Sequence, residues 1–150
     1  MQTIDSILIP IDMSDDARNA FYQGISLATK MGAKAHVLYV SEPIRAFDFN
    51  KKAYVETKET IEQIEEGVNR RIDDLWKSGG LDAVDRRKVN LLVRGGKAPK
   101  EIVDSAAHHK VDLIVMGCGT SGSNLGATTE RVVRNAPCSV WVVRTPETED

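Results

Sequence analysis

The chain has 150 residues, of which 41% are hydrophobic and 28% charged, and its formal net charge is −2. This composition is typical of a globular protein, and we predict one domain over residues 1–150 with a sizeable core. The small negative charge gives no reason to expect nucleic acid or an anionic membrane as a partner. No apolar run reaches membrane-spanning length and no signal-peptide pattern opens the chain, so we predict a cytoplasmic protein.

The first part of the chain predicts two buried strands with a helix between them. An apolar run over residues 4–9, followed by the letters PID, predicts a strand that ends in a turn. The next segment carries apolar residues on one helical face, with Ser14 or Asp15 able to cap its start and Gly32 to end it. Residues 35–40, AHVLYV, predict the second strand.

The middle of the chain predicts a loop, a long helix, a third strand and a further helix. Residues 41–52 break the apolar pattern, which indicates a loop that closes over a site or packs at an edge. Residues 54–77 predict a helix, residues 88–94 a strand, and Pro99 opens the next helix. The long helix carries a core stripe at steps of three and four, formed by Ile61, Ile64, Val68, Ile72 and Leu75.

The last third of the chain predicts a strand, a glycine-rich loop, a helix and a final strand. The helix carries Val132, Val133 and Ala136 on one side, and Pro137 ends it. In order, these elements are the strand at 111–116, the loop at 117–127, the helix from Thr128 and the strand at 139–144. The chain therefore alternates strands and helices throughout. This alternation predicts an α/β fold with a doubly wound, five-stranded parallel sheet and helices on both faces.

A ligand site is expected where the order of strands reverses. With strand order 3-2-1-4-5, the first and fourth strands flank that point, and ligands bind outside their carboxyl ends. The turn from Pro10 to Ser14 should then face the glycine loop. Glycines in this loop let backbone amides approach a ligand, and the loop leads into a helix N-terminus, which favours an anion. Ser121 and Ser123 add hydroxyl donors. The alternative is a merely flexible connection between strand and helix.

The cysteines and histidines suggest no metal or catalytic site. Cys118 and Cys138 do not form a disulfide framework or a metal motif, so we expect buried or half-buried thiols. His108 and His109 lie at a predicted helix end, where we expect them to cap the helix or to face solvent.

The sequence resembles the universal stress protein family over essentially its whole length, and three segments carry the resemblance. The opening strand into IPID with Ser14 resembles the family's (V/T)D-x-S turn. VRGGKAPKEIVDSAAHHKVDLIVMG resembles its central segment with I-x-x-x-A, and ERVVRNAPCSVWVVR is the most specific match, to its closing helix and strand. The resemblance implies a fold like that of the adenine nucleotide alpha hydrolases.

Nucleotide-binding members of this family carry G-x2-G-x9-G-(S/T) in the glycine loop. Here only three residues separate Gly122 from Gly126, and Ala127 stands where the family has Ser or Thr. Thr128 and Thr129 can supply the missing hydroxyl. The loop is therefore several residues shorter than the usual one, and we expect it to hold one phosphate group firmly and to bind ATP and ADP within about tenfold of each other.

By resemblance, the ligand is ATP or ADP, with or without a divalent ion such as Mg²⁺. Asp12 would accept hydrogen bonds from the ribose, backbone near Pro10 and Val40 would contact adenine, and the loop amides would hold phosphate. The resemblance also implies a homodimer through the strand at 139–144. The expected binding residues are Pro10, Asp12, Ser14, Val40, Met116, Gly117, Gly119, Gly122, Gly126, Ala127, Thr128 and Thr129.

These expectations favour an adenine-nucleotide-binding protein of stress response or signalling, whose bound state alters the choice of a protein partner. The alternative is a nucleotide-free member of the family that acts as a dimeric interaction module. An enzyme, at most a slow ATPase, is disfavoured because the glycine loop carries no lysine and no nucleophile is paired with a general base. We expect no catalytic residues and no metal ligands. Lys51 or Lys52 could supply a phosphate contact if residues 41–52 fold over the site.

Overall fold

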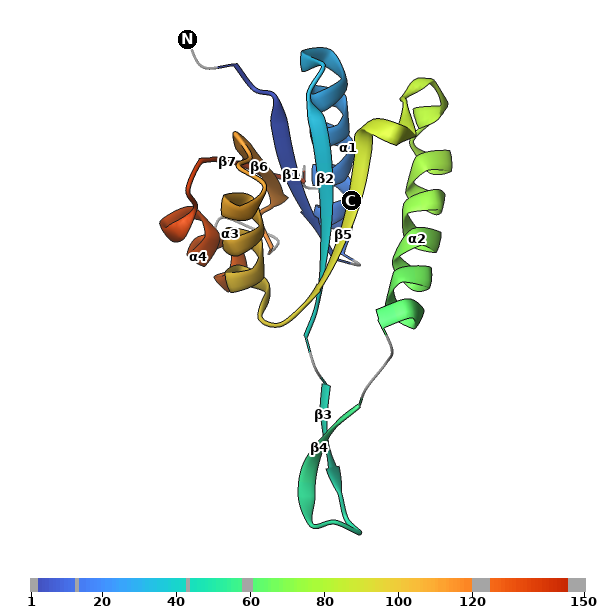
Figure 1. Ribbon diagram of the computed structural model, residues 1–150, viewed down its shortest axis with the longest axis vertical. Coiled ribbons are helices and arrows are strands. Elements are labelled where there is room, and N and C mark those ends of the chain that lie inside the picture. Colours follow the sequence, from blue (N-terminus) through green and yellow to red (C-terminus); the bar gives the residue numbers. More distant parts are fainter. Residues whose placement is uncertain (1–2, 13, 43, 58–60, 120–124, 146–150) are drawn as a thin grey trace, which may run out of the picture.

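The computed structural model of the protein describes residues 3–12, 14–42, 44–57, 61–119 and 125–145. Figure 1 shows its elements. In chain order they are β1 (Ser6–Ile11), α1 (Asp15–Met31), β2 (Lys34–Ser41), β3 (Ile44–Asp48), β4 (Ala53–Thr57), α2 (Ile61–Ser78), β5 (Val89–Gly95), α3 (Ala98–His108), β6 (Leu113–Gly117), α4 (Ala127–Asn135) and β7 (Ser139–Val143). None of the described helices is long and apolar enough to cross a membrane.

The main sheet has five parallel strands in the order β5-β2-β1-β6-β7. Counted along the chain within this sheet, the order is 3-2-1-4-5, which confirms the predicted topology. The order reverses between β1 and β6, because the chain first builds outward through β2 and β5 and then returns to add β6 and β7. The crossover helices lie on both faces of the sheet (Figure 1).

Alternating side chains on the central strands build two separate cores. On β1, Ile7 and Ile9 pack with the helices α1 and α2, whereas Leu8, between them, packs on the opposite face with α3 and α4. All three are fully buried, and each buried aliphatic side chain contributes about 1.5–3 kcal/mol. The sheet is therefore covered on both sides, as a parallel sheet requires.

Helix α1 begins and ends as expected. Ser14 is its N-cap and accepts a hydrogen bond from the Ala17 amide at 3.2 Å. Gly32 ends the helix in the left-handed conformation at φ 65°, and its own amide donates to the Ala28 and Thr29 carbonyls. The cap fixes the first turn of α1 directly after β1, which places that turn at the carboxyl edge of the sheet.

The segment after β2 differs from the prediction. Residues 41–52 are not a plain loop, and the helix expected from residue 54 begins only at Ile61; instead, β3 and β4 form an antiparallel hairpin. The Asp48 carboxylate accepts hydrogen bonds from the Asn50 and Lys51 amides and fixes the turn. Figure 1 shows the hairpin extending away from the main sheet, so it does not close over the strand ends. Its Phe47, Phe49 and Tyr54 rings contact one another.

Two predicted apolar stripes are only partly buried. In α2, Val68, Ile72 and Leu75 lie in the core as expected, but Ile61 is 68% exposed because it occupies the first position of the shortened helix. In α4, Val132 is fully buried whereas Val133 is 45% exposed, because Val133 lies about 100° around the helix axis from Val132 and turns away from the packed side.

Two histidines stack at the amino edge of the sheet. His109 ends α3, as expected, with its amide donating to the Ser105 carbonyl, but its ring lies 4.7 Å from the ring of His36 on β2. His36 is 4% exposed, and its Nδ1 accepts a hydrogen bond from the Asn90 side-chain amide at 3.2 Å. The expectation that His109 only caps or faces solvent was therefore incomplete, because it did not include this buried partner.

Candidate functional site

A pocket opens between β1 and β6, at the point where the order of strands reverses. These strands share only two register pairs, Ile7 with Leu113 and Leu8 with Ile114, although β1 stays paired with β2 as far as Ile11. Pro10, which has no N–H to donate, lies in the stretch where β1 is paired on the β2 side alone. The separation leaves a cavity of about 260 Å³ at the carboxyl edge of the sheet.

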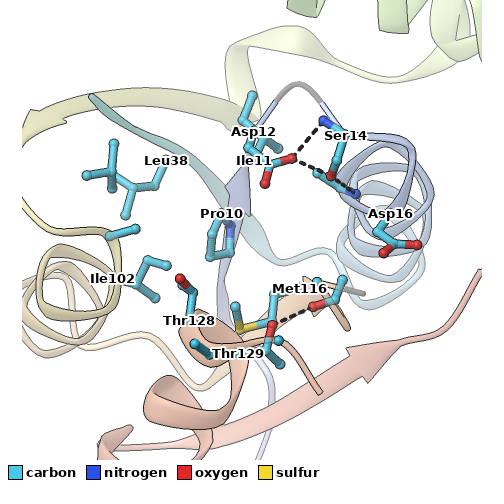
Figure 2. A pocket seen from close by; sticks show the side chains of 17 residues that line it. Pro10, Ile11, Asp12, Ser14, Asp16, Leu38, Ile102, Met116, Thr128 and Thr129 are labelled. Carbon is cyan, nitrogen blue, oxygen red and sulfur yellow. Dashed lines mark hydrogen bonds between the residues drawn. The ribbon is translucent and has the colours of Figure 1, made fainter. Parts of the chain in front are cut away.

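Most of the residues expected at the site line this one pocket. Figure 2 shows them converging from β1, β2, β6 and the starts of α1 and α4. Gly122 lies outside the described residues, as do Ser121 and Ser123. The expected residues that line the pocket are Pro10, Asp12, Ser14, Val40, Met116, Gly117, Gly119, Gly126, Ala127, Thr128 and Thr129.

The inner walls of the pocket are apolar. Leu38 and Val40 come from β2, Ile102 from α3 and Met116 from β6, and Leu38, Ile102 and Met116 are buried. Such walls around a narrow space suit a flat heteroaromatic ring, which gains from burial without requiring a charge.

Sequence reasoning missed several lining residues, although the pattern contained a signal for some of them. Leu38 is two residues before Val40 and therefore shares its face of the strand. Ala98 and Ile102 are four residues apart and lie on one face of α3, the helix that follows β5. The missed lining residues are Ile11, Asp16, Ala17, Leu38, Ala98 and Ile102.

Asp12 stands at the tip of β1 with half of its carboxylate engaged. Its Oδ1 accepts hydrogen bonds from the amide of Ser14, at 2.8 Å, and from the hydroxyl of Ser14 (Figure 2). Its Oδ2 has no hydrogen-bond partner among the residues that the structure describes. Asp12 can therefore have two roles, because one oxygen organises the turn into α1 while the other remains able to accept a hydrogen bond from a ligand hydroxyl.

The N-terminus of α4 presents backbone donors to the pocket. The first intrahelical hydrogen bond runs from the Glu130 amide to the Gly126 carbonyl, and no side chain of the described residues caps the helix. The amides of Ala127, Thr128 and Thr129 thus precede the hydrogen-bonded ladder, where an anion is favoured. The Thr128 side chain points into the pocket (Figure 2).

Two expected phosphate donors are already used inside the loop. The amide of Gly126 donates to the Cys118 carbonyl at 2.8 Å, and the buried hydroxyl of Thr129 donates to the Gly117 carbonyl at 2.9 Å. Together they close the base of the loop against α4. These groups therefore shape the site and do not offer a hydrogen to a ligand.

Glycine is required at both ends of this closed loop. Gly119 has φ +82°, and a Cβ on it would lie 3.3 Å from the Gly126 Cα and the Thr129 hydroxyl. A Cβ on Gly126 would in turn lie 3.2 Å from Gly119. A side chain at Gly119 is disfavoured by the positive φ, and at either position a Cβ would require the two halves of the loop to move apart by a few tenths of an ångström.

The cysteines and acidic groups give no sign of a metal centre. Cys118 is buried and Cys138 half-buried, as expected, and burial raises the pKa of the Cys138 thiol. Among the described residues, no cluster of three or more His, Cys, Asp or Glu could hold a metal ion. The residues of the hairpin, Lys51 and Lys52 included, are not among those that line the pocket.

Comparison with known proteins decides the family. Residues 3–144 match the profile of the Universal stress protein family. The chain belongs to the universal stress protein family. A universal stress protein of Staphylococcus saprophyticus is 32% identical over 154 residues, with 98% of this chain and 87% of the relative covered. One from Methanocaldococcus jannaschii is 31% identical, with 95% of this chain and 84% of the relative covered.

Solved structures of universal stress proteins share the fold of this chain. Universal stress protein UspA from Lactobacillus plantarum has a TM-score of 0.67 and 26% identity, with 96% of this chain and all of that chain covered. A universal stress protein in complex with cAMP has a TM-score of 0.65 and 19% identity, with 95% and 98% covered. The second likeness supports the fold alone.

Proposed function

We propose that this universal stress protein binds an adenine nucleotide, ATP or ADP in the first instance, in the pocket between β1 and β6. The observation that carries this proposal is the convergence of three unlike surfaces in one cavity. An apolar slot suits the base, the Oδ2 of Asp12 suits a ribose hydroxyl, and the open N-terminus of α4 suits a phosphate. A solved neighbour of the same fold is described in complex with cAMP, which supports this use of the fold.

The proposed role is binding and signalling, with no turnover required. The bound state would alter which protein partner the molecule selects in a stress response. The described lining contains no Lys, Arg or His, and the Ser14 hydroxyl that donates to the Asp12 carboxylate belongs to the N-cap of α1. Such a lining can hold a nucleotide but has no cationic group to stabilise charge on a transferred phosphoryl group.

Asp12→Ala should weaken binding by about 1–3 kcal/mol, because it removes a charge-assisted hydrogen bond to the ribose. Calorimetric titration with ADP measures the loss. Asp12→Asn separates the two roles of the residue, since its Oδ1 can still accept from Ser14 while the negative charge is gone. Asp15→Ala, in the same turn but outside the pocket lining, is the control and should bind as the wild type does. Absence of binding by the wild type at millimolar adenine nucleotide would refute the proposal.

The second candidate function is a dimeric interaction module, with or without nucleotide, and β7 favours it. This strand is one edge of the main sheet, and its Trp141 is 38% exposed. An apolar edge strand tends to pair with another strand unless it is protected. We propose that two copies pair β7 with β7 in antiparallel fashion about a two-fold axis.

Val142→Lys should convert a dimer of this kind to monomer or to aggregate, because it places a charge within the pairing strand. Light scattering at tens of micromolar protein measures the mass. Met31→Lys is a matched control, since Met31 is 48% exposed at the end of α1 and lies outside the edge strand. A wild type that is monomeric under these conditions rules out the β7 dimer.

A further inference from the structure

The β3–β4 hairpin forms an arm whose aromatic side chains are open to solvent. Phe47 and Tyr54 are directly opposite in its register with ring centroids 5.3 Å apart, and the ring of Phe49 lies 5.0 Å from that of Phe47. Phe47 is 42% exposed, Tyr54 72% and Phe49 83%. A two-stranded hairpin on its own is only marginally stable in water. The arm would therefore be stabilised by a surface that covers these three rings.

The outer end of the arm is basic as well as aromatic. Lys51 and Lys52 are exposed and follow the turn that the Asp48 carboxylate fixes. Neither lysine forms an ion pair with any residue that the structure describes. Lys51 is two residues from the most exposed ring, Phe49, so this end of the arm suits a partner that is both apolar and acidic.

The first turns of α2 present such a surface. Ile61 is 68% exposed, and the exposed carboxylates of Glu62, Glu65 and Glu66 lie near it on the helix. Glu62 is three residues from Glu65 and four from Glu66, spacings at which like charges on a helix repel each other. Within the described part of the chain, none of the three is paired with a cation. Two lysines on a partner would relieve this repulsion.

The end of the arm and the start of α2 do not meet within one molecule. Figure 1 shows the arm extending away from the sheet, with its turn at the end that is far from α2. Five register pairs separate this turn from the base of the arm, a length of about 17 Å. The two surfaces can therefore meet only between molecules. A two-fold axis would bring each arm to the other copy's α2, so that the contact is made twice.

We propose that the arm docks on the start of α2 in a second copy of this chain. The aromatic face covers Ile61, and Lys51 and Lys52 face the carboxylates of Glu65 and Glu66, in both directions about the two-fold axis. An anionic membrane or a nucleic acid would attract the lysines but would leave the acidic and apolar start of α2 without a partner, whereas a second copy uses both surfaces. This interface includes neither the nucleotide pocket nor β7.

The size of this interface predicts a weak and reversible association. An aromatic side chain can bury about 150–250 Å², and two arms with the surface they cover come to about 1,200 Å², the lower end of the range for specific interfaces. Exposed ion pairs add little to affinity but oppose a wrong partner when their sign is reversed. We therefore expect the contact to form at hundreds of micromolar protein, on top of any pairing through β7.

Sedimentation of the purified full chain over a range of concentrations tests the proposal. The average mass should rise between tens and hundreds of micromolar, and Phe49→Ser should reduce the rise. Lys51→Glu with Lys52→Glu should lower the association constant by about tenfold or more, because the ion pairs of both contacts become repulsive. Lys30→Glu with Lys77→Glu is the matched control, since it changes the net charge equally at exposed positions outside the arm and should associate as the wild type does.

Charge complementation separates a lost contact from a misfolded variant. Glu65→Lys with Glu66→Lys should also prevent association. An equal mixture of this variant with the Lys51→Glu, Lys52→Glu variant should regain it, because each arm then meets an α2 of opposite charge on the other chain. Two misfolded variants would not recover on mixing. A mixture that stays as dissociated as its components overturns the proposal.

A zero-length carbodiimide cross-linker locates the contact. In a mixture of isotope-labelled and unlabelled wild type, it should join Lys51 or Lys52 of one copy to Glu65 or Glu66 of another, and mass spectrometry should find the mixed-isotope peptides. An average mass that stays constant up to hundreds of micromolar, or a rise that both charge-reversed variants keep, overturns the proposal. Binding of the arm to phosphatidylserine vesicles or to an oligonucleotide, without self-association, overturns the second copy as its partner. The proposed function is tested separately, because the residues of the arm are not among those that line the pocket.

Discussion

Lowering the pH from 6.5 to about 4 should remove roughly 3 kcal/mol of unfolding free energy through His36 alone. The pKa of His36 is lowered from 6.5 to about 4 in the folded protein, first by burial and then by the neighbouring His109 and Lys34. The unfolded chain therefore takes up a proton near pH 6.5, whereas the folded chain resists it until about pH 4. Stability is fully present above the unfolded pKa and falls as the pH drops through this window.

The geometry explains why protonation of the His36 ring is unfavourable. In the neutral ring, Nδ1 accepts a hydrogen from the Asn90 amide, and a proton on Nδ1 would face that donor. Burial and the charges of His108, Arg94 and Lys34 also lower the pKa of His109, so its titration adds to the loss with the same sign. The neighbouring His109 ring thus opposes protonation of His36.

Urea unfolding at several pH values measures this effect. His36→Asn keeps an acceptor near the Nδ1 position but removes the titrating group, so its stability should fall less steeply between pH 6.5 and 4 than that of the wild type. Carboxylates titrate equally in both proteins and cancel from the difference. His108→Asn is the comparison variant, because His108 is exposed and acts on His109, so it should change the pH profile less than His36→Asn does. A wild type and a His36→Asn variant with parallel pH profiles would show that His36 does not resist protonation.

Gly117→Ala should destabilise the fold by about 1–3 kcal/mol and weaken nucleotide binding with it. The added Cβ would lie 2.9 Å from the backbone carbon and oxygen of Asp16, which are held in the capped first turn of α1. Relief requires β6 or α1 to shift. Either movement disturbs the Gly117 carbonyl that accepts from Thr129, and with it the closed base of the loop.

Gly67→Ala provides a control with the opposite sign. Gly67 lies within α2, and a Cβ built there meets nothing within 4 Å. Alanine at this position should stabilise the protein by about 0.5–1 kcal/mol, because it favours the helix without a clash. Urea unfolding measures the stability of both variants, and ADP titration measures nucleotide binding by Gly117→Ala. Wild-type stability in Gly117→Ala would mean that β6 and α1 are not packed as tightly as the structure indicates.

The topology could be predicted from the sequence because each strand of the main sheet is a short apolar run, and segments with helical spacing of apolar residues lie between these runs. The hairpin was not, because Tyr54, Val55 and Glu56 can continue the charged, helix-like pattern that follows them. The Asp48 side chain fixes the turn of the hairpin through two backbone amides, and five register pairs join its strands. Such a contact depends on conformation and has no periodic signature.

The sequence predicted which residues line the pocket better than it predicted which hydrogen bonds those residues make. Asp12 and the glycine loop were expected, and the structure places both at one pocket. The sequence pattern could not show that the Thr129 hydroxyl donates a hydrogen bond to the Gly117 carbonyl, because that bond forms only when the loop closes. Asp16 was not among the expected site residues, because its proximity to Cys118 joins residues far apart in the chain.

The pairing between β1 and β6 ends early. As a result, the shape of the cavity and the polar groups that line it have different structural origins. The opening comes from strand connectivity, since two neighbouring strands that share only two register pairs part before their ends. The polar side chains of the lining stand on the turns and helix starts around that opening. If the proposed function holds, substitutions at Thr128 should change ligand preference while the strand connectivity that forms the opening stays the same. Related chains could diverge in what they sense by exchanging only these rim residues.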